Sequence, residues 1–331
     1  VGTYTSPHLE HITERFKRNG EPISEEELAE QIGAVADVAP LVGQNPGYFE
    51  ILTAAAFRWF ADIAVDVMVI EVGLLGRWDA TNIVESQVAV ITNIGMDHNE
   101  FAGPSIRDVA EEKSGIIKPG SAVVVGETDP ELVEIFRNAG GATTLVRDLD
   151  FATVGNSLAV NGRLLDLRTP TTIYTDVVLP LNGAHQGDNA ALALTAVETF
   201  FAAPVPEEVV QEGFAEVTMP GRFEVLGRQP LVIVDGAHNP IGADTCASVF
   251  FGDFHPDGRR ILVVGTLREP MEMLAALRAD EFDIVFVATA PSPRGIPAAD
   301  LAAAAEQLGC DHVVSFDDVE TACRRALEYA D

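Results

Sequence analysis

The sequence predicts an α/β protein with parallel sheets, arranged as two domains. Two observations support this prediction: short runs of β-branched apolar residues alternate with helical patterns along almost the whole chain, and the strand-like runs are apolar on both faces. Strands that are buried on both faces and joined by helices form parallel sheets. The length of 331 residues exceeds what one hydrophobic core usually supports, which indicates two domains.

The elements follow in order from these patterns. A strand is expected at Val1–Thr5, and Ser24 with Glu27 matches a capping box at the start of a helix. Further strands are expected at Val67–Val72, Val88–Ile94, Ala122–Val125, Leu231–Val234, Ile261–Val264, Ile284–Ala288 and Val313–Phe316. Helices are expected at Ser24–Asp37, Phe49–Ala61, Ser105–Ile116, Ala190–Phe200, Ile241–Phe250 and Ala298–Leu308.

Residues Phe151–Leu179 interrupt this alternation. Val154-Gly-Asn-Ser and Val160-Asn-Gly-Arg resemble hairpin turns, so a small antiparallel insert is expected there. The α/β pattern resumes after Met219-Pro-Gly-Arg222. We therefore place the domains at residues 1–222 and 223–331.

The charge balance excludes some partners. The chain has 21 basic and 51 acidic residues, a net charge of −30. No excess of basic residues is available to neutralise a nucleic acid or an anionic membrane, whereas a nucleotide needs only a local site. The three cysteines show no CxxC spacing, and neither a signal peptide nor a membrane-spanning run is visible. We therefore expect a cytoplasmic protein.

Acidic residues follow two of the expected strands. Glu71 ends one strand, and Asp97 and His98 follow the next. The carboxyl ends of neighbouring parallel strands meet at one edge, where such sheets bind ligands. These side chains could converge on a magnesium ion, with Asp79 as a substrate contact. The alternatives are a Glu71 that caps a neighbouring helix and a structural His98.

Lys113 lies in the run Glu111-Glu-Lys113-Ser, just before apolar Ile116. This position predicts a lysine directed towards the strand ends. A desolvated amine becomes neutral more readily and can react with carbon dioxide to give a carbamate, an anionic oxygen ligand for magnesium. The alternative is a salt bridge to Glu111, Glu112 or Asp108 on a solvated helix face.

Three further segments place polar side chains at turns between strands and helices. They are Gly183-Ala-His185-Gln-Gly-Asp-Asn189, Pro220-Gly-Arg222 and Val234-Asp235-Gly-Ala-His238-Asn-Pro240. A phosphate or a ribose could bind at such turns. Each segment alone is equally consistent with a helix cap or a turn.

Taken together, these motifs resemble one family, the dihydrofolate synthase/folylpolyglutamate synthase branch of the Mur ligases. The resemblance covers the whole chain. It rests on Thr5-Ser-Pro-His-Leu9, Tyr48-Phe-Glu50, Glu71-Val-Gly, Asp79-Ala-Thr-Asn82, Thr92-Asn-Ile-Gly-Met-Asp-His98, Glu112-Lys-Ser-Gly-Ile-Ile-Lys118, His185-Gln-x-x-Asn189, Pro220-Gly-Arg222 and Asp235-Gly-Ala-His-Asn-Pro240. It implies a P-loop-type central ATPase domain with a small antiparallel insert, followed by a Rossmann-like C-terminal glutamate-ligase domain.

The resemblance also implies an activity and its residues. ATP would phosphorylate a carboxylate of dihydropteroate or folate, and the amine of L-glutamate would attack the acyl phosphate. Two magnesium ions would be held by Ser6 and by Glu71, His98 and carbamylated Lys113. The implied substrate contacts are Tyr48, Phe49, Glu50, Asp79 and Ala80, and the implied ATP contacts are Asn189, Arg222, Asp235 and His238. Lys113 and His238 would serve catalysis, His238 near the transferring phosphate. The family is commonly monomeric.

The sequence departs from the family pattern in four places. The resemblance places a Gly-x-x-Gly-Lys-Ser phosphate loop ahead of Val1 and a strand and helix beyond Asp331. Leu75 replaces a usual glycine, and Leu267-Arg-Glu-Pro270 replaces a usual Asp-Lys-Asp. A chain without the phosphate loop is expected not to turn over ATP. The alternatives are a Mur ligase that acts on a peptidoglycan precursor and a non-catalytic binding module.

Overall fold

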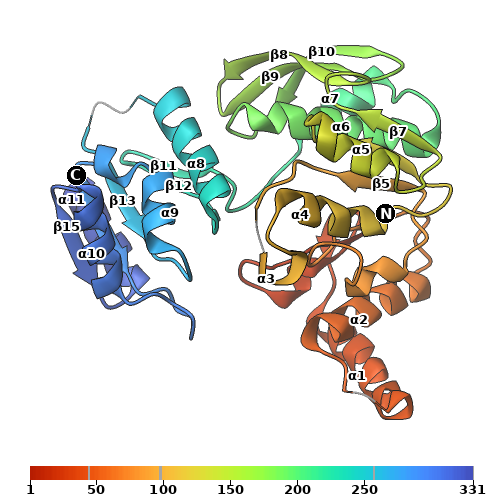
Figure 1. The fold of residues 1–331 in the computed structure, drawn as a ribbon, viewed down its shortest axis with the longest axis horizontal. Helices are drawn as coiled ribbons and strands as arrows, with labels where there is room; N and C mark the ends of the chain where they lie inside the picture. The colour runs from red at the N-terminus through yellow and green to blue at the C-terminus, as the bar shows by residue number, and fades with distance from the viewer. Residues whose placement is uncertain (44, 97–98, 256–257, 331) are drawn as a thin grey trace. The chain divides into compact units, whose positions relative to one another are not determined.

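The computed structural model describes residues 1–43, 45–96, 99–255 and 258–330 (Figure 1). The chain forms two compact units: Val1–Ala152 with Leu192–Pro204, and Thr153–Ala191 with Val205–Asp331. The predicted α/β class with parallel sheets and a small antiparallel insert is confirmed. No helix in the described part of the chain is both long and apolar enough to span a membrane.

The first sheet of unit 1 has the order β3-β2-β1-β4. Its strands are β1 (Gly2–Tyr4), β2 (Phe16–Arg18), β3 (Glu21–Pro22) and β4 (Met68–Ile70), with β1 parallel to β4 and antiparallel to β2. The helices α1 (Glu25–Val42) and α2 (Tyr48–Asp62) pack on it through buried Tyr4, Phe16, Leu52 and Phe60. The capping box of Ser24 and Glu27 is confirmed at the start of α1.

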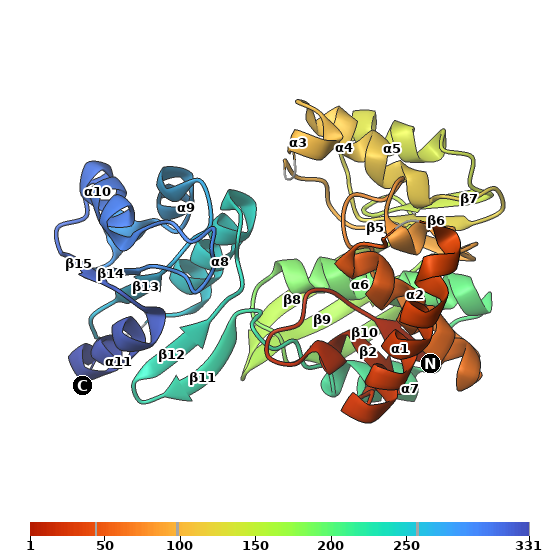
Figure 2. The ribbon, with the colours of Figure 1, turned by 90° about the horizontal axis from the view of Figure 1, so that it is seen from below.

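The second sheet of unit 1 is parallel. It contains β5 (Val88–Ile91), β6 (Ala122–Val125) and β7 (Thr143–Val146). The helices α4 (Ile106–Lys113) and α5 (Pro130–Arg137) cover one face through Val109 and Phe136 (Figure 2). The short elements of unit 1 are η1 (Ile12–Arg15), η2 (Ala80–Ile83), α3 (Asn99–Ala102) and η3 (Ser114–Ile116).

Unit 2 begins with the insert sheet, in the order β10-β9-β8. Its strands are β8 (Ala152–Ala159), β9 (Gly162–Arg168) and β10 (Ile173–Leu179), followed by α6 (His185–Phe201) and α7 (Glu207–Ala215). From Leu192 onward, α6 belongs to unit 1. The turn predicted at Val160-Asn-Gly-Arg is confirmed, with Asn161 in the left-handed region. The turn predicted at Val154-Gly-Asn-Ser is wrong, because β8 continues through it and Gly155 packs against Asp166 of β9.

The rest of unit 2 holds an antiparallel pair and a parallel sheet. β11 (Glu224–Arg228) pairs with β12 (Leu231–Val234), and the parallel sheet contains β13 (Ile261–Val264), β14 (Ile284–Ala288) and β15 (Val313–Phe316). The helices are α8 (Pro240–Asp253), α9 (Pro270–Ala276), α10 (Ala298–Leu308) and α11 (Val319–Ala330), with η4 (Ala279–Glu281). α9 and α10 cover one face of the parallel sheet and α11 covers the other (Figure 2).

β4 differs from its prediction in burial. β4 was expected to be buried on both faces, but Met68 and Val69 are 44% and 55% exposed. The reason is that β4 is the edge strand of its described sheet. Its carboxyl end nevertheless lies beside that of β1, because the two strands are parallel and in register from Gly2 with Met68 to Tyr4 with Ile70.

Candidate functional site

The ends of β1 and β4 bring two predicted metal ligands together. The amide of Ser6 donates a hydrogen bond of 2.7 Å to Oε2 of Glu71. The amide of Glu71 donates in turn to the carbonyl of Tyr4 at 2.9 Å. The parallel register therefore places the Ser6 hydroxyl and the Glu71 carboxylate at one edge of the sheet. Both are oxygen donors of the kind that magnesium prefers.

The segment that carries Ser6 is held by the residues after it. The amides of Leu9, Glu10 and His11 donate to the carboxylate of Glu14 at 2.6 to 2.9 Å. These bonds, first the one from His11, lower the pKa of Glu14 from 4.5 to about 2. The Thr5–His11 segment is thus folded around one carboxylate.

Arg15 fixes His8 in the same segment. Its Nε donates to Nδ1 of His8 at 2.9 Å, and its guanidinium carbon lies 5.8 Å from the centre of the Tyr48 ring. Arg15 is only 7% exposed. The pattern Thr5-Ser-Pro-His-Leu9 was identified from sequence, but its supports Glu14 and Arg15 were missed.

Phe49 lies against the loop that follows β4. Its ring stacks on Tyr4 with centres 5.9 Å apart. A Cβ atom at Gly73 would lie 2.4 Å from the Phe49 ring, so only glycine allows this contact. Tyr48, the first residue of α2, is 59% exposed, and Glu50 accepts a hydrogen bond from the Gly47 amide. Phe49 therefore lies near Glu71, and the Glu50 carboxylate caps its own helix.

Asp79 organises the η2 loop, which we define as residues 73–83. Its Oδ2 accepts from the amide of Leu74 at 2.8 Å, and its Oδ1 accepts from the amide and the hydroxyl of Thr81. Both carboxylate oxygens therefore already stabilise the loop. Ala80 is the first residue of η2 and is half-buried. Asp79 fixes the position at which Ala80 is presented.

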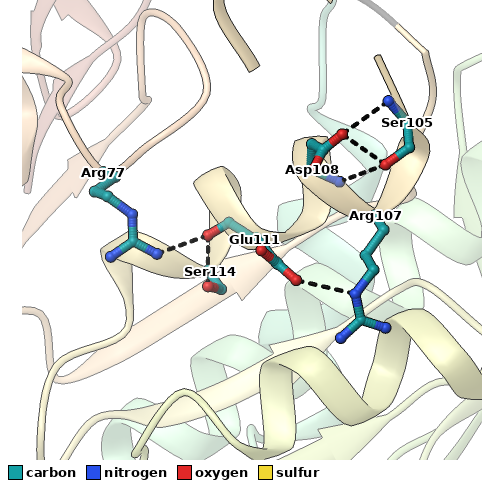
Figure 3. A network of polar contacts seen from close by, with 6 residues as sticks. All are labelled: Arg77, Ser105, Arg107, Asp108, Glu111 and Ser114. Atoms are coloured by element: carbon teal, nitrogen blue, oxygen red, sulfur yellow. Dashed lines mark hydrogen bonds and ion pairs between the residues drawn. The ribbon is translucent and has the colours of Figure 1, made fainter. Parts of the chain in front are cut away.

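The C-terminal end of α4 lies against this loop (Figure 3). Arg77 donates from Nη2 to the carbonyl of Glu111 at 3.0 Å and from Nε to Oε1 of Glu112 at 3.3 Å. Glu111 is also paired with Arg107 at 3.0 Å. Lys113, the last residue of α4, is half-buried.

The third predicted metal ligand, His98, lies outside the described residues. Across the residues that the structure does describe, no three His, Cys, Asp or Glu side chains gather closely enough to hold a metal ion. The bond that joins two of the predicted ligands runs from the Ser6 amide to the Glu71 carboxylate, and the Ser6 side chain carries a hydroxyl on the same segment. The carboxylate and the hydroxyl are each a hard oxygen donor that fits a magnesium ion which also takes oxygens from a phosphate.

The predicted nucleotide residues lie in unit 2. Asp235 follows β12, and its Oδ2 accepts from the amide of Phe223 while its Oδ1 accepts from the amide of Ala237, both at 2.8 Å. The Gly236 amide donates to the carbonyl of Gly221 at 2.7 Å. These bonds join the turn that carries Arg222 to the turn that carries His238. Three predicted residues, Arg222, Asp235 and His238, are thus brought together.

The remaining predicted nucleotide contact, Asn189, lies on α6. Asn189 is exposed on the first turns of α6, and its Nδ2 donates to Oε1 of Gln186 at 3.0 Å. His185 begins the same helix, and desolvation lowers its pKa against the opposing effects of Asp235, Asp188 and Asp253. The ring of His185 lies over Gly183, where a Cβ atom would be 2.5 Å from it.

Another carboxylate at a strand end was missed from sequence. Glu127 follows β6, and its carboxylate accepts from the amides of Ile94, Thr128 and Asp129 at 2.7 to 2.9 Å. It therefore fixes the segment Thr92–Gly95 that leads towards His98. The pattern that identified Glu71, an acidic residue at the end of a β-branched run, could also have identified Glu127, which follows Val125 after one glycine.

Comparisons with known proteins match the two parts of the chain to two domains of the Mur ligases. The Mur ligase middle domain matches residues 45–197, and the Mur ligase glutamate ligase domain matches residues 221–331. The dihydrofolate synthase/folylpolyglutamate synthase of Mycobacterium tuberculosis is 37% identical over all of this chain and 73% of its own length.

Solved structures agree with these matches. Mycobacterium tuberculosis folylpolyglutamate synthase complexed with ADP and AMPPCP superposes with a TM-score of 0.91 at 38% identity, over 99% of this chain and 77% of that one. A bifunctional folylpolyglutamate synthase/dihydrofolate synthase with Mn, AMPPNP and L-glutamate bound gives a TM-score of 0.85 at 32% identity, over 100% and 77% of the two chains.

Proposed function

Because the chain belongs to the dihydrofolate synthase/folylpolyglutamate synthase family of Mur ligases, we propose that it adds L-glutamate to dihydropteroate, to folylpolyglutamate or to both. The family consists of ATP-dependent glutamate ligases of folate metabolism, and ATP with a divalent metal serves the reaction. The observation that supports the proposal for this chain is the bond from the Ser6 amide to the Glu71 carboxylate, which joins two segments that each carry a hard oxygen donor.

In this proposal, unit 1 supplies the metal ligands and the pteroate contacts. Ser6 would hold one magnesium ion, and Glu71, His98 and carbamylated Lys113 would hold a second. When bound, the metals offset the negative charge of the phosphate oxygens. Tyr48, Phe49, Glu50, Asp79 and Ala80 would contact the pteroate. The ring of Phe49 against Gly73 supports this role, because it offers a flat apolar surface close to Glu71.

In the same proposal, unit 2 supplies the nucleotide contacts. Arg222 and Asn189 are exposed and able to donate hydrogen bonds to ATP. Asp235 holds the turns that carry Arg222 and His238. Nδ1 of His238 lies 3.1 Å from the carbonyl of Gly236, which orients the ring so that Nε2 is available to a phosphate.

The reaction then has two steps. A substrate carboxylate oxygen attacks the γ-phosphorus of ATP, the bond to the β-phosphate oxygen breaks, and ADP leaves. The neutral amine of L-glutamate next attacks the acyl carbon, phosphate leaves with the bonding electrons, and the nitrogen loses a proton. Arg222 and His238 would stabilise the charge on the phosphoryl oxygens, which is the main requirement of such transfers.

The chain is further proposed to act as a monomer in the cytoplasm. Its three cysteines are free thiols. Burial raises the pKa of the Cys246 thiol to about 12, so this thiol is not reactive.

The test is a product analysis with the protein as its gene encodes it. ATP, magnesium and L-glutamate are supplied with dihydropteroate, with a reduced folate, or with a UDP-muramoyl peptide. We expect ADP, phosphate and a product heavier by one glutamyl residue with either of the first two substrates. Turnover with the UDP-muramoyl peptide alone would refute the proposal and favour the peptidoglycan alternative.

A further inference from the structure

Arg77 makes three bonds to the end of α4, of which Figure 3 draws the one to the carbonyl of Glu111. Its amide donates to the carbonyl of Glu112 at 3.0 Å, its Nη2 donates to the carbonyl of Glu111 at 3.0 Å, and its Nε donates to the Glu112 carboxylate at 3.3 Å. The last four carbonyls of a helix have no partner within the helix, and the helix dipole places partial negative charge there. Arg77 therefore donates to two of these carbonyls and adds a positive charge where it is favourable. Ser114 donates to the same two, from its hydroxyl to the Glu111 carbonyl at 2.7 Å and from its amide to the Glu112 carbonyl.

The backbones of the loop and the helix end are also in close contact. A Cβ atom at Gly115 would lie 2.6 Å from Cα of Arg77, and one at Gly76 would lie 3.0 Å from the carbonyl oxygens of Glu112 and Lys113. Nδ2 of Asn82 bridges the two segments, donating to the carbonyls of Arg77 at 2.9 Å and Gly115 at 3.1 Å. Two glycines thus permit the contact, and Arg77 and Asn82 bond across it.

The two segments carry different parts of the proposed site. The η2 loop presents Asp79 and Ala80, and the three bonds to the Asp79 carboxylate hold it as one piece. The helix end presents Lys113, which directly follows Glu112, and Arg77 donates a hydrogen bond to the carboxylate of Glu112. A shift of the loop is therefore transmitted to the residue next to Lys113.

A simple surface ion pair would not explain this arrangement. The side chains of Arg77 and Glu112 are 46% and 24% exposed, and such pairs contribute on the order of 1 kcal/mol or less. The same helix carries a surface ion pair between Arg107 and Glu111, whose side chains are 63% and 50% exposed and lie on one helix face. Within the described part of the chain, Arg107 bonds to Glu111 of its own helix and not to the η2 loop, so it provides a matched control.

We propose that Arg77 is a positioning residue that couples the pteroate contacts of the η2 loop to the placement of Lys113, so that pteroate and magnesium strengthen each other's binding. This inference rests on the proposed function, because it takes Asp79 and Ala80 as substrate contacts and Lys113 as a metal ligand. Coupling of this kind is reciprocal: if pteroate raises the affinity for magnesium, then magnesium raises the affinity for pteroate by the same factor.

The experiment measures that factor without turnover. Dihydropteroate is titrated calorimetrically into the gene-encoded protein, once with magnesium and a non-hydrolysable ATP analogue and once with the analogue and a chelator. In the wild type we expect magnesium to raise the affinity about tenfold. Arg77→Ala is expected to reduce the ratio to about one, whereas Arg107→Ala keeps the wild-type ratio. Arg77→Lys should give an intermediate ratio, because lysine keeps the charge but loses the forked geometry.

A structural readout accompanies the titration. Hydrogen exchange of the η2 loop and of residues 110–117 should become faster together in Arg77→Ala and remain at wild-type rates in Arg107→Ala. If Arg77→Ala fails to fold, Arg77→Lys carries the test on its own. An unchanged affinity ratio in the Arg77 variants, or a wild-type ratio of one, overturns the coupling. A wild-type protein that binds no dihydropteroate instead overturns the proposed function.

Discussion

The amide of Ser6 and the carboxylate of Glu71 are joined by a 2.7 Å hydrogen bond across 65 residues of sequence. The bond exists because β1 and β4 are parallel neighbours whose carboxyl ends lie together. Replacement of Glu71 by glutamine keeps an acceptor for Ser6 but removes the charge. We expect Glu71→Gln to lower kcat/KM for ligation roughly 100-fold or more with little change in Tm. Glu85→Gln, an exposed carboxylate of the same unit, is the control, and equal kinetics in the two variants would contradict a metal role.

Lys113 provides a second prediction. If it carries a carbamate next to Glu71, Lys113→Ala should abolish ligation while circular dichroism and Tm stay at wild-type values. A short carboxylic acid added to the variant should restore part of the activity by replacing the lost ligand. Lys17→Ala, which removes a lysine of β2 in the same unit, is the matched control. Near-normal turnover in Lys113→Ala would instead favour a surface salt bridge.

Gly73 tests the placement of Phe49. In Gly73→Ala the new Cβ atom would lie 2.4 Å from the Phe49 ring, so the ring must move. We expect a loss of about 1–3 kcal/mol in the free energy of unfolding and a higher KM for the pteroate substrate. Gly33→Ala serves as control because its Cβ meets nothing within 4 Å, and it should stabilise α1 by up to about 1 kcal/mol. An unchanged KM in Gly73→Ala would place the pteroate elsewhere.

Glu14 gives a prediction about pH. Its pKa is lowered from 4.5 to about 2 by the amides of His11, Leu9 and Glu10. A carboxylate with a lowered native pKa stabilises the fold fully above its unfolded pKa and loses this contribution as pH falls towards its native pKa. The wild type should therefore exceed Glu14→Gln in stability at pH 6, and the difference should shrink as pH falls from 4.5 towards 2. Urea denaturation at several pH values measures this difference, and a gap that widened towards acid would be inconsistent with the bonds to Glu14.

Strands and helix starts were predictable where the residues of the element itself determine it. The β-branched run Ala122–Val125 is a strand with the predicted bounds, and Ser24 with Glu27 caps α1 as expected. Val154-Gly-Asn-Ser was misread, because a glycine in a strand resembles a turn until its partner strand is known.

The residues that position the site were harder to predict, because their partners are distant in sequence. Arg77 and Glu112 lie 35 residues apart, and their contact depends on the close approach of Gly76 and Gly115. Two glycines near two polar segments indicate that some backbone approaches each of them, but not which one. Glu14 and Arg15 could not be predicted for the same reason, because their bonds form only once the segment Thr5–His11 has folded back towards them.

The parallel pairing of β1 with β4 also sets an order of events during synthesis. The antiparallel pair β1 and β2 closes locally, whereas β1 cannot meet β4 until α1 and α2 have been made. At ribosomal speeds, the interval between Ser6 and Glu71 corresponds to several seconds, on the order of 3 to 13 s. During that time the edge of β1 that β4 later covers is exposed to other chains. A nascent chain stalled within α2 should therefore recruit chaperones more strongly than one stalled after β4 has left the exit tunnel.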